Sequence, residues 1–252
     1  MIPPHDDELT SDTLFQGRLQ CRQYRQGYRF SVDAVLAAHF SVPASGQRVL
    51  DLGCGCGIIG LIVALFHPEV FVAGLELQEE LAALATANAC RNGLSGRIAV
   101  TQGNVQSMSS LYPPEEFDLV ICNPPYRKRL SGRVNQTGQA AMARHELTAG
   151  IADFVRASAY CVKNKGRVVF VYPANRCSAL LAALSHNRLV LKRLQPVYSY
   201  PEAAEAKLIL AEAIKNGGEH CALMAPLYIY ERKNGRYSPA MQALHTGGAT
   251  SC

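Results

Sequence analysis

The stretch RVLDLGCGCGIIGLIVALF, residues 48–66, decides the fold. It opens with an apolar run that predicts a buried strand over 48–52. Three glycines follow at alternate positions: Gly53, Gly55 and Gly57. Residues without a Cβ let the backbone turn sharply and approach a ligand closely. Apolar residues then recur with helical spacing as far as Phe66. A strand, a glycine turn and a helix in this order predict a cofactor cradle in a doubly wound sheet.

The glycine turn by itself leaves the class of cofactor open. Residues 55–60 read GCGIIG and satisfy the dinucleotide pattern G-x-G-x-x-G, so a nicotinamide or flavin enzyme is one interpretation. Asp51 favours another, because a carboxylate at the mouth of the turn repels a pyrophosphate but attracts a positively charged ligand. S-adenosylmethionine, with its sulfonium and ammonium groups, is such a ligand. A turn used only to pack the strand against the helix is the alternative without a ligand.

Composition sets wide bounds on the protein. A chain of 252 residues, 48% of them hydrophobic, can bury a substantial core. The net charge of +5 is compatible with a polyanionic partner without requiring one. The N-terminal residues lack the order of a signal peptide, and no apolar run approaches the ~18 residues of a membrane span. We therefore expect a soluble cytoplasmic protein with no membrane contact.

Nine cysteines are scattered along the chain without paired CxxC spacing, which predicts reduced thiols. Cys54 and Cys56 form one close pair, and both lie inside the glycine turn, where small side chains are needed. We interpret them as small apolar residues, and we expect no metal site.

Strands and helices are expected to alternate along most of the chain. Residues 1–13 are polar and acidic and predict a disordered N-terminus, and residues 245–252 predict a frayed tail. Short strands with interleaved arginines and aromatic residues are expected over 14–30, and a small strand over 223–231. Longer strands are predicted over 48–52, 70–76, 97–101, 117–122, 166–172, 189–198 and 207–215, and helices over 32–40, 58–66, 78–91, 105–111, 151–163 and 175–184.

This alternation predicts an α/β fold of the doubly wound, Rossmann-like type. It implies right-handed crossovers and a mostly parallel, seven-stranded sheet with helices on both faces. The last two strands are expected to pair antiparallel at one edge. Ligands of such a sheet bind at the carboxyl ends of the strands.

Polar residues at predicted strand ends and helix starts are candidate ligands of a nucleoside. Glu76 closes the second strand, where an acid accepts hydrogen bonds from ribose hydroxyls. Asn104 follows the third strand, where its amide could pair with an adenine edge or simply form the loop. Asp33 lies in the first turn of the helix over 32–40, where it either favours the helix dipole or contacts the cofactor.

The fourth strand ends in Asn123, Pro124, Pro125 and Tyr126. Two consecutive prolines remove backbone donors and stiffen the loop. They leave the Asn123 side-chain oxygen and the Pro124 carbonyl as fixed acceptors beside an aromatic ring. Two acceptors can hold a planar amino group while Tyr126 stacks on the ring that bears it. A proline-rich turn without a ligand is the alternative.

DLGCGCG at 51–57, Glu76 and NPPY at 123–126 together resemble the class I S-adenosylmethionine-dependent methyltransferases that modify amino nitrogens. Three flanking blocks, GYRFSVDA at 27–34, ARHE at 143–146 and LYIY at 227–230, resemble the bacterial family that methylates N6 of the adenine beside the anticodon of valine tRNA. The resemblance extends over about residues 14–244 and implies one methyltransferase domain over that range. Many members of the class have an aspartate where this chain has Asn104.

The resemblance assigns roles to the candidate residues and makes tRNA the expected partner. Asp51 and the three glycines would hold the methionine half of S-adenosylmethionine, while Glu76, Asn104, Asp33 and Asn123 complete the cofactor site. Asn123, Pro124 and Tyr126 would be catalytic. Substrate contacts are expected from Pro125 and from basic residues in the segment after it: Arg127, Lys128 and Arg144.

Three other activities and one binding role stay open on the sequence. The same chemistry could act on a glutamine side chain of a translation release factor, or on N2 of a guanine in ribosomal RNA. A nicotinamide-dependent oxidoreductase would use the same glycine turn but leaves NPPY unexplained. A non-catalytic RNA-binding module would retain only a vestigial cofactor site.

Overall fold

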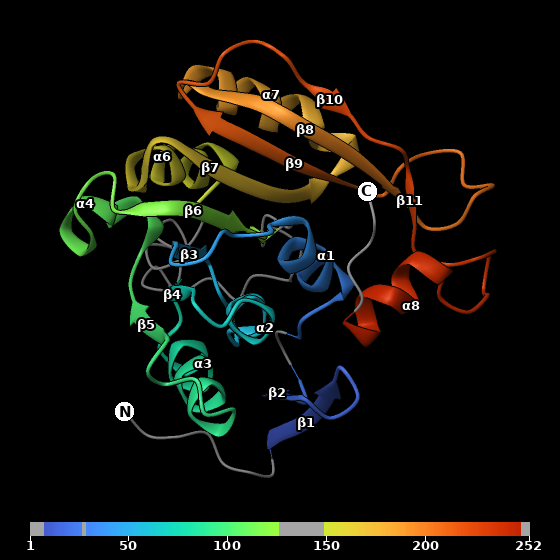
Figure 1. Cartoon of the computed structure of the whole chain (residues 1–252), viewed down its shortest axis with the longest axis horizontal. Helices are drawn as coiled ribbons and strands as arrows, with labels where there is room; N and C mark the ends of the chain where they lie inside the picture. Colours follow the sequence, from blue (N-terminus) through green and yellow to red (C-terminus); the bar gives the residue numbers. More distant parts are fainter. Residues whose placement is uncertain (1–7, 27–28, 126–148, 248–252) are drawn as a thin grey trace, which may run out of the picture.

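The computed structural model describes residues 8–26, 29–125 and 149–247. A sheet of nine strands forms its centre (Figure 1). Five parallel strands run side by side in the order β5 (Ile98–Gln102), β4 (Phe71–Glu76), β3 (Arg48–Leu52), β6 (Phe117–Cys122) and β7 (Val162–Pro173). Beyond β7 lie β9 (Leu208–Lys215), β8 (Leu189–Tyr198) and two short strands on β8, β10 (Ala222–Leu223) and β11 (Leu227–Tyr228).

The predicted fold class is confirmed, with two differences in the sheet. β10 and β11 raise the strand number from seven to nine, and each pairs with β8 for two residues. The antiparallel strand is β9, and it lies inside the sheet and not at its edge, hydrogen-bonded to both β7 and β8. β8 therefore runs parallel to β3–β7, and its carboxyl end lies at the same edge of the sheet as theirs.

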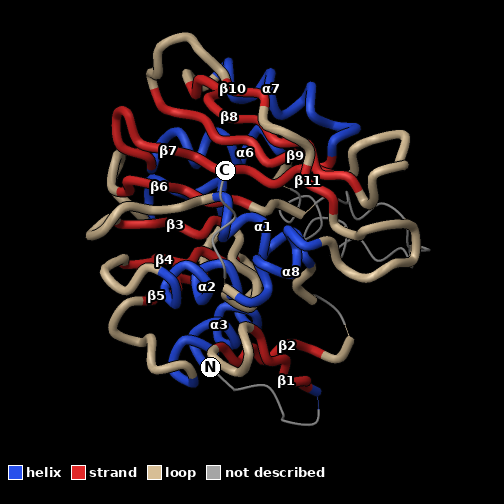
Figure 2. Tube along the Cα trace, turned by 45° about the vertical axis from the view of Figure 1, so that its right-hand side comes forward, coloured by secondary structure: helices blue, strands red, loops and turns tan. Residues whose placement is uncertain are grey.

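Helices cover both faces of the sheet (Figure 2). One face packs on α1 (Val32–Phe40), α2 (Ile58–Phe66), α3 (Glu79–Arg91) and α8 (Pro239–Thr246). The other packs on α4 (Met108–Leu111), α6 (Ile151–Cys161) and α7 (Cys177–His186), and single 3-10 turns precede α4 and α7 at Val105–Ser107 and Ala174–Arg176. Because successive side chains of a strand point to opposite faces, Val49 joins the first core and Leu50 the second. A sheet covered on both faces explains why a central strand such as β6 is mostly apolar.

The expected disorder of residues 1–13 is wrong from Leu9 onward. β1 (Leu9–Leu14) and β2 (Leu19–Tyr24) form an antiparallel hairpin. Its polar residues face outward and hid the strand pattern, whereas Leu9 is only 5% exposed. Asn88 of α3 and Asn92, the residue that caps the end of this helix, hold β2 in place, since each exchanges hydrogen bonds with its backbone.

The expected frayed tail is also wrong at its start, because α8 continues to Thr246. Ser238 caps the helix by accepting a hydrogen bond from the Met241 amide, and Pro239 occupies the first turn. Gly247 ends it in the left-handed conformation, at φ +84°. A third boundary differs at β7, which begins directly after α6 at Val162, where it pairs with the first residue of β6.

In the described part of the chain, no helix is long and apolar enough to cross a membrane. Within the same residues, His, Cys, Asp and Glu side chains form no cluster of three suited to a metal ion.

A buried acid ties the antiparallel strand to both of its neighbours in the sheet. Glu212 of β9 is 6% exposed and accepts hydrogen bonds from Arg167 of β7 and Arg193 of β8. The two guanidinium groups also donate to the carbonyls of Phe40 and Val42, at the end of α1. One carboxylate thus joins three elements of the sheet and the last turn of α1.

Replacing Glu212 with Gln should lower the free energy of unfolding by about 3 kcal/mol, because it leaves two partly buried cations without their counter-charge. Urea denaturation measures the loss. Glu205→Gln, at an exposed position in the loop before β9, is the matched control and should change stability by less than about 0.5 kcal/mol. Equal stabilities of E212Q and the parent would contradict this role.

Candidate active site

Three predicted site residues lie in one row at the carboxyl ends of neighbouring strands. Leu52 of β3 pairs with Leu75 of β4 on one side and with Cys122 of β6 on the other. The residues after this row are Gly53, Glu76 and Asn123. Neighbouring strands lie about 4.8 Å apart, so the register brings the glycine turn, the acid and the proline corner together at the carboxyl edge.

The glycine turn needs its glycines for backbone conformation and for space. Gly53, Gly55 and Gly57 have φ values of +81°, +57° and +85°, a region that other residues rarely adopt. A Cβ on Gly57 would lie 3.1 Å from the Cβ of Ala85 in α3, and one on Gly53 would lie 3.3 Å from the ring of Phe154 in α6. The turn is therefore pressed between helices on both faces of the sheet.

The carboxylate of Glu76 fixes the glycine turn by accepting backbone hydrogen bonds. Its Oε2 accepts a hydrogen bond from the Gly55 amide at 2.9 Å, and its Oε1 accepts one from the Gln78 amide at 2.9 Å. The side chain is 7% exposed. Each carboxylate oxygen can accept more than one hydrogen bond, so acceptor sites remain for two neighbouring hydroxyls. These acceptor sites fit the hydroxyls of a ribose, and the contact with a cofactor ribose stays a prediction.

Asp51 lies elsewhere than expected. The alternation of β3 turns its side chain under the first turn of α2, where Oδ2 accepts a hydrogen bond from the Gly60 amide at 3.2 Å. It is 1% exposed, so the expectation of a carboxylate open at the mouth of the turn is wrong. Oδ1 is buried and has no hydrogen-bond partner among the described residues. Burial raises the pKa of this carboxyl from 3.8 to about 7, and the nearby charge of Glu76 adds to the rise.

The interpretation of Cys54 and Cys56 as small apolar residues is confirmed. Cys54 is 3% exposed and fills the space left by the missing side chain of Gly74, and Cys56 is fully buried. Burial, together with the charge of Asp51, raises the pKa of the Cys54 thiol well above its usual value, so the thiol stays protonated.

Asn104 serves as a helix cap. Its Oδ1 accepts a hydrogen bond from the Gln106 amide at 2.9 Å and so begins the turn before α4. Its Nδ2 group is the part of the side chain left to meet an adenine, and the pairing with a cofactor stays a prediction. Asp33 lies in the first turn of α1 behind the cap residue Ser31, as predicted. Its contact with the cofactor stays a prediction.

The proline corner is described up to Pro125. Asn123 is partly exposed, Pro124 is buried and Pro125 is exposed, so the corner rises from the sheet toward solvent. The other predicted catalytic and substrate-binding residues lie outside the described residues: Tyr126, Arg127, Lys128 and Arg144.

Two supports of the turn were missed by the sequence analysis. Asn88 of α3 is fully buried, and its Nδ2 donates to the carbonyl of Cys56 and to that of Arg22 in β2. This amide ties the glycine turn to the N-terminal hairpin. Phe154 contacts Gly53 from the opposite face. No local pattern marks either residue, because their partners are distant in the chain.

Comparison with known proteins now decides the family. Residues 31–186 match the family model described as methyltransferase small domain, and this range holds the turn, Glu76 and Asn123. The chain belongs to this family. S-adenosylmethionine is its cofactor, and the dinucleotide interpretation of GCGIIG is set aside.

Two relatives and one solved structure add detail to this family assignment. A tRNA1(Val) (adenine(37)-N6)-methyltransferase of Porphyromonas gingivalis is 34% identical over 168 residues, which are 66% of this chain and 65% of the relative, just under two thirds of its length. A protein of the same name from Pedobacter heparinus is 26% identical over 86% of this chain and 88% of its own. The structure of a predicted O-methyltransferase from Agrobacterium tumefaciens is similar in fold, with a TM-score of 0.71, 24% identity, and coverage of 86% of this chain and 97% of that one.

The protonation of Asp51 should appear in the pH dependence of stability. Its folded pKa of about 7 lies above the ordinary 3.8, so the folded protein keeps a proton that the unfolded chain has lost. Stability is therefore highest below pH 4 for this group and falls as the pH rises to 7, by on the order of 4 kcal/mol. Urea unfolding of the cofactor-free protein and of Asp51→Asn at pH 5 and pH 8 measures the difference. The fall should be smaller in D51N, and parallel pH profiles would contradict the assignment.

Proposed function

We propose that this protein transfers the methyl group of S-adenosylmethionine to N6 of an adenine in the anticodon loop of a tRNA. The observation that carries the proposal is the corner Asn123-Pro124-Pro125 at the end of β6, in register with Glu76 and the glycine turn. An amino-group acceptor and a cofactor cradle thus follow adjacent strands. The relatives named tRNA1(Val) (adenine(37)-N6)-methyltransferase support the choice of substrate.

The described residues divide the work between cofactor and substrate. The backbone of the glycine turn and the carboxylate of Glu76 would bind the cofactor, whose ribose hydroxyls can donate to Glu76. Asp51 would act on the cofactor only indirectly, by holding the first turn of α2 through its hydrogen bond from the Gly60 amide.

The substrate amine would meet two acceptors. The side-chain oxygen of Asn123 and the carbonyl of Pro124 can each accept one N–H of an exocyclic amino group. Because proline fixes φ and lacks an N–H, the corner is rigid and presents no competing backbone donor at Pro124 and Pro125. Both acceptors draw electron density toward the nitrogen and restrict its orientation, which favours attack along one direction.

When bound, S-adenosylmethionine would supply an electrophilic methyl carbon to N6, with S-adenosylhomocysteine as the leaving group. The sulfonium is already a good leaving group, so the chain has to position the reactants more than to activate them. The amino proton is released to solvent after transfer, and we assign no general base. Pro125 and the predicted residues Tyr126, Arg127, Lys128 and Arg144 would contact the RNA.

Incubation with labelled S-adenosylmethionine and unfractionated tRNA, followed by nucleoside analysis, tests the proposal. N6-methyladenosine should form, and Asn123→Ala should lower kcat at least about 100-fold, in line with the loss of one positioned hydrogen-bonding group in other active sites. Cofactor affinity, measured by calorimetry, should stay within about threefold, because Glu76 and the turn are unchanged.

Asn164→Ala is the matched control, since Asn164 is an exposed asparagine near the amino end of β7, at the opposite edge of the sheet. It should retain parental kcat. Label in guanosine or in protein would assign a different amino acceptor, and parental activity of N123A would remove the proline corner from the mechanism.

A further inference from the structure

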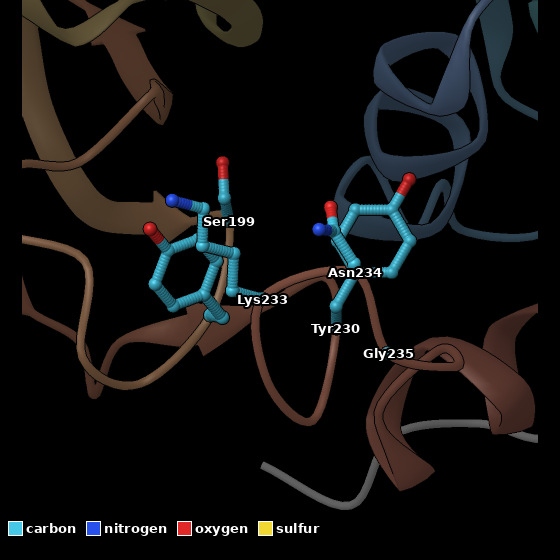
Figure 3. A pocket seen from close by; sticks show the side chains of 6 residues that line it. Ser199, Tyr230, Lys233, Asn234 and Gly235 are labelled. Atoms are coloured by element: carbon cyan, nitrogen blue, oxygen red, sulfur yellow. The ribbon is translucent and has the colours of Figure 1, made fainter.

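A second site lies beyond the end of β8. It is a pocket of about 430 Å³ lined by residues from two loops: Ser199, Tyr200, Tyr230, Lys233, Asn234 and Gly235. Figure 3 shows Tyr230 and Asn234 on one side of the space, and Ser199 and Lys233 on the other. Backbone hydrogen bonds join the two loops, since the Tyr230 amide donates to the Ser199 carbonyl at 2.8 Å. The walls of the pocket are therefore fixed relative to β8.

Most of the lining comes from a tight hairpin over residues 229–238. The Glu231 amide donates to the Arg236 carbonyl, and the Gly235 amide closes the turn on the Arg232 carbonyl at 2.9 Å. Asn234 adopts the left-handed conformation at φ +56°, which asparagine tolerates better than most residues. A hairpin closed in this way presents its side chains in a preformed arrangement.

The hairpin carries an aromatic column that ends at the pocket. The rings of Tyr230 and Tyr237 stack with centroids 5.4 Å apart and planes within 13°. Tyr237 stacks in turn on His245 of α8, at 4.9 Å and 15°. Tyr237 is thus the middle ring, and Tyr230 is the end of the column that lines the pocket. Tyr230 is 37% exposed, so part of its ring is open to solvent.

The charges beside the column are mostly positive. Arg232, Lys233 and Arg236 are exposed on the hairpin, and Glu231 pairs with Arg236. Burial lowers the pKa of His245, so the ring at the base of the column is neutral at pH 7. Lys233 reaches the pocket itself. Lys233 forms no ion pair with the residues that the structure describes, and a flat aromatic face next to such a cation suits a ligand that combines a planar ring with a negative charge.

The pocket faces the same edge of the sheet as the methyl-transfer site. β8 runs parallel to β6, so the ends of both strands point to one side of the molecule, where β11 and the loop after it also lie (Figure 1). β6 and β8 are separated by β7 and β9. Three strand spacings lie between β6 and β8, and Ser199 lies four residues further along the chain of β8 than the level of Asn123. Asn123 and the pocket are therefore about 20 Å apart. That distance corresponds to about six stacked nucleotides.

We propose that this pocket binds an unpaired nucleotide of the RNA substrate, several positions away from the methylated base, with the base stacked on Tyr230 and its phosphate on Lys233. The inference rests on the proposed function and identifies where the same substrate is held a second time. Asn234 and Ser199 offer both donors and acceptors to the base edge. A second contact at this distance orients the RNA, so that one adenine among several reaches the proline corner.

The chain contains no tryptophan, so a single introduced one reports on the site. In Tyr230→Trp the new indole should be quenched by at least about half when unfractionated tRNA or a ten-nucleotide oligoadenylate binds, because bases stack on it. Phe71→Trp is the control: Phe71 is 53% exposed at the amino end of β4, and its replacement should show no quenching. An unchanged signal from Y230W at RNA concentrations that saturate binding, as measured by anisotropy of labelled RNA, overturns the proposal.

Three further variants separate stacking from charge. Tyr230→Ala should weaken RNA binding about tenfold, and Tyr230→Phe should match the parent because it keeps the ring. Lys233→Ala should reduce the slope of log K against log salt by about one, as expected for one lost phosphate contact. Cofactor affinity should stay at the parental value in all three. Equal RNA affinity of Y230A and Y230F excludes a stacked base.

The two proposals fail separately. Quenching of Y230W by RNA in a protein that methylates no tRNA would leave the pocket as a nucleotide site and remove the proposed reaction. Methylation of tRNA adenine without quenching of Y230W would support the proposed reaction and exclude the pocket as a nucleotide site. Quenching by inorganic polyphosphate as strong as that by oligoadenylate would show a purely ionic site and overturn the stacked base.

Discussion

The hydrogen bonds of one carboxylate hold the site together. Glu76 accepts the amide of Gly55 in the turn and that of Gln78 at the start of α3, so a single side chain fixes two segments that a cofactor must touch at once. The Gly55 amide lies in the buried turn and would otherwise be left unsatisfied, at a cost of about 1–3 kcal/mol. The same carboxylate remains available as an acceptor. Binding and folding therefore depend on the same group, and the cradle exists before any ligand arrives.

The pairing register of the strands also places the proline corner beside the glycine turn. Because Leu52 pairs with both Leu75 and Cys122, the residues that follow these three strands leave the sheet side by side. The proline corner gains its position from β6 and its rigidity from Pro124 and Pro125. Chemistry that depends on placement is thus built on the most buried strands of the molecule, with the glycine turn held by helices on both faces.

The features of the fold and the site that could be predicted from the sequence are those set by residues close together in the chain. The strand, turn and helix over 48–66 were predicted because the signals are local, and the match of helix α1 with its Ser31 cap has the same origin. The burial of Asp51 under α2 was missed, since it depends on which face of β3 the helix covers. Asn88 and Phe154 gave no signal, because their partners lie far away in the sequence. The hairpin at Leu9 was missed since its polar, outward face conceals the buried one.

The position of β9 also governs when the fold can be completed during synthesis. β9 is the last long strand to leave the ribosome, yet it pairs with β7 on one side and β8 on the other. Until residue 215 has emerged, two strands have open edges that could pair with other chains. The strands of the cofactor half, β3 to β6, can pair among themselves earlier in synthesis, with β3 between β4 and β6. A nascent chain can thus acquire its ligand cradle while its far edge still requires protection from aggregation.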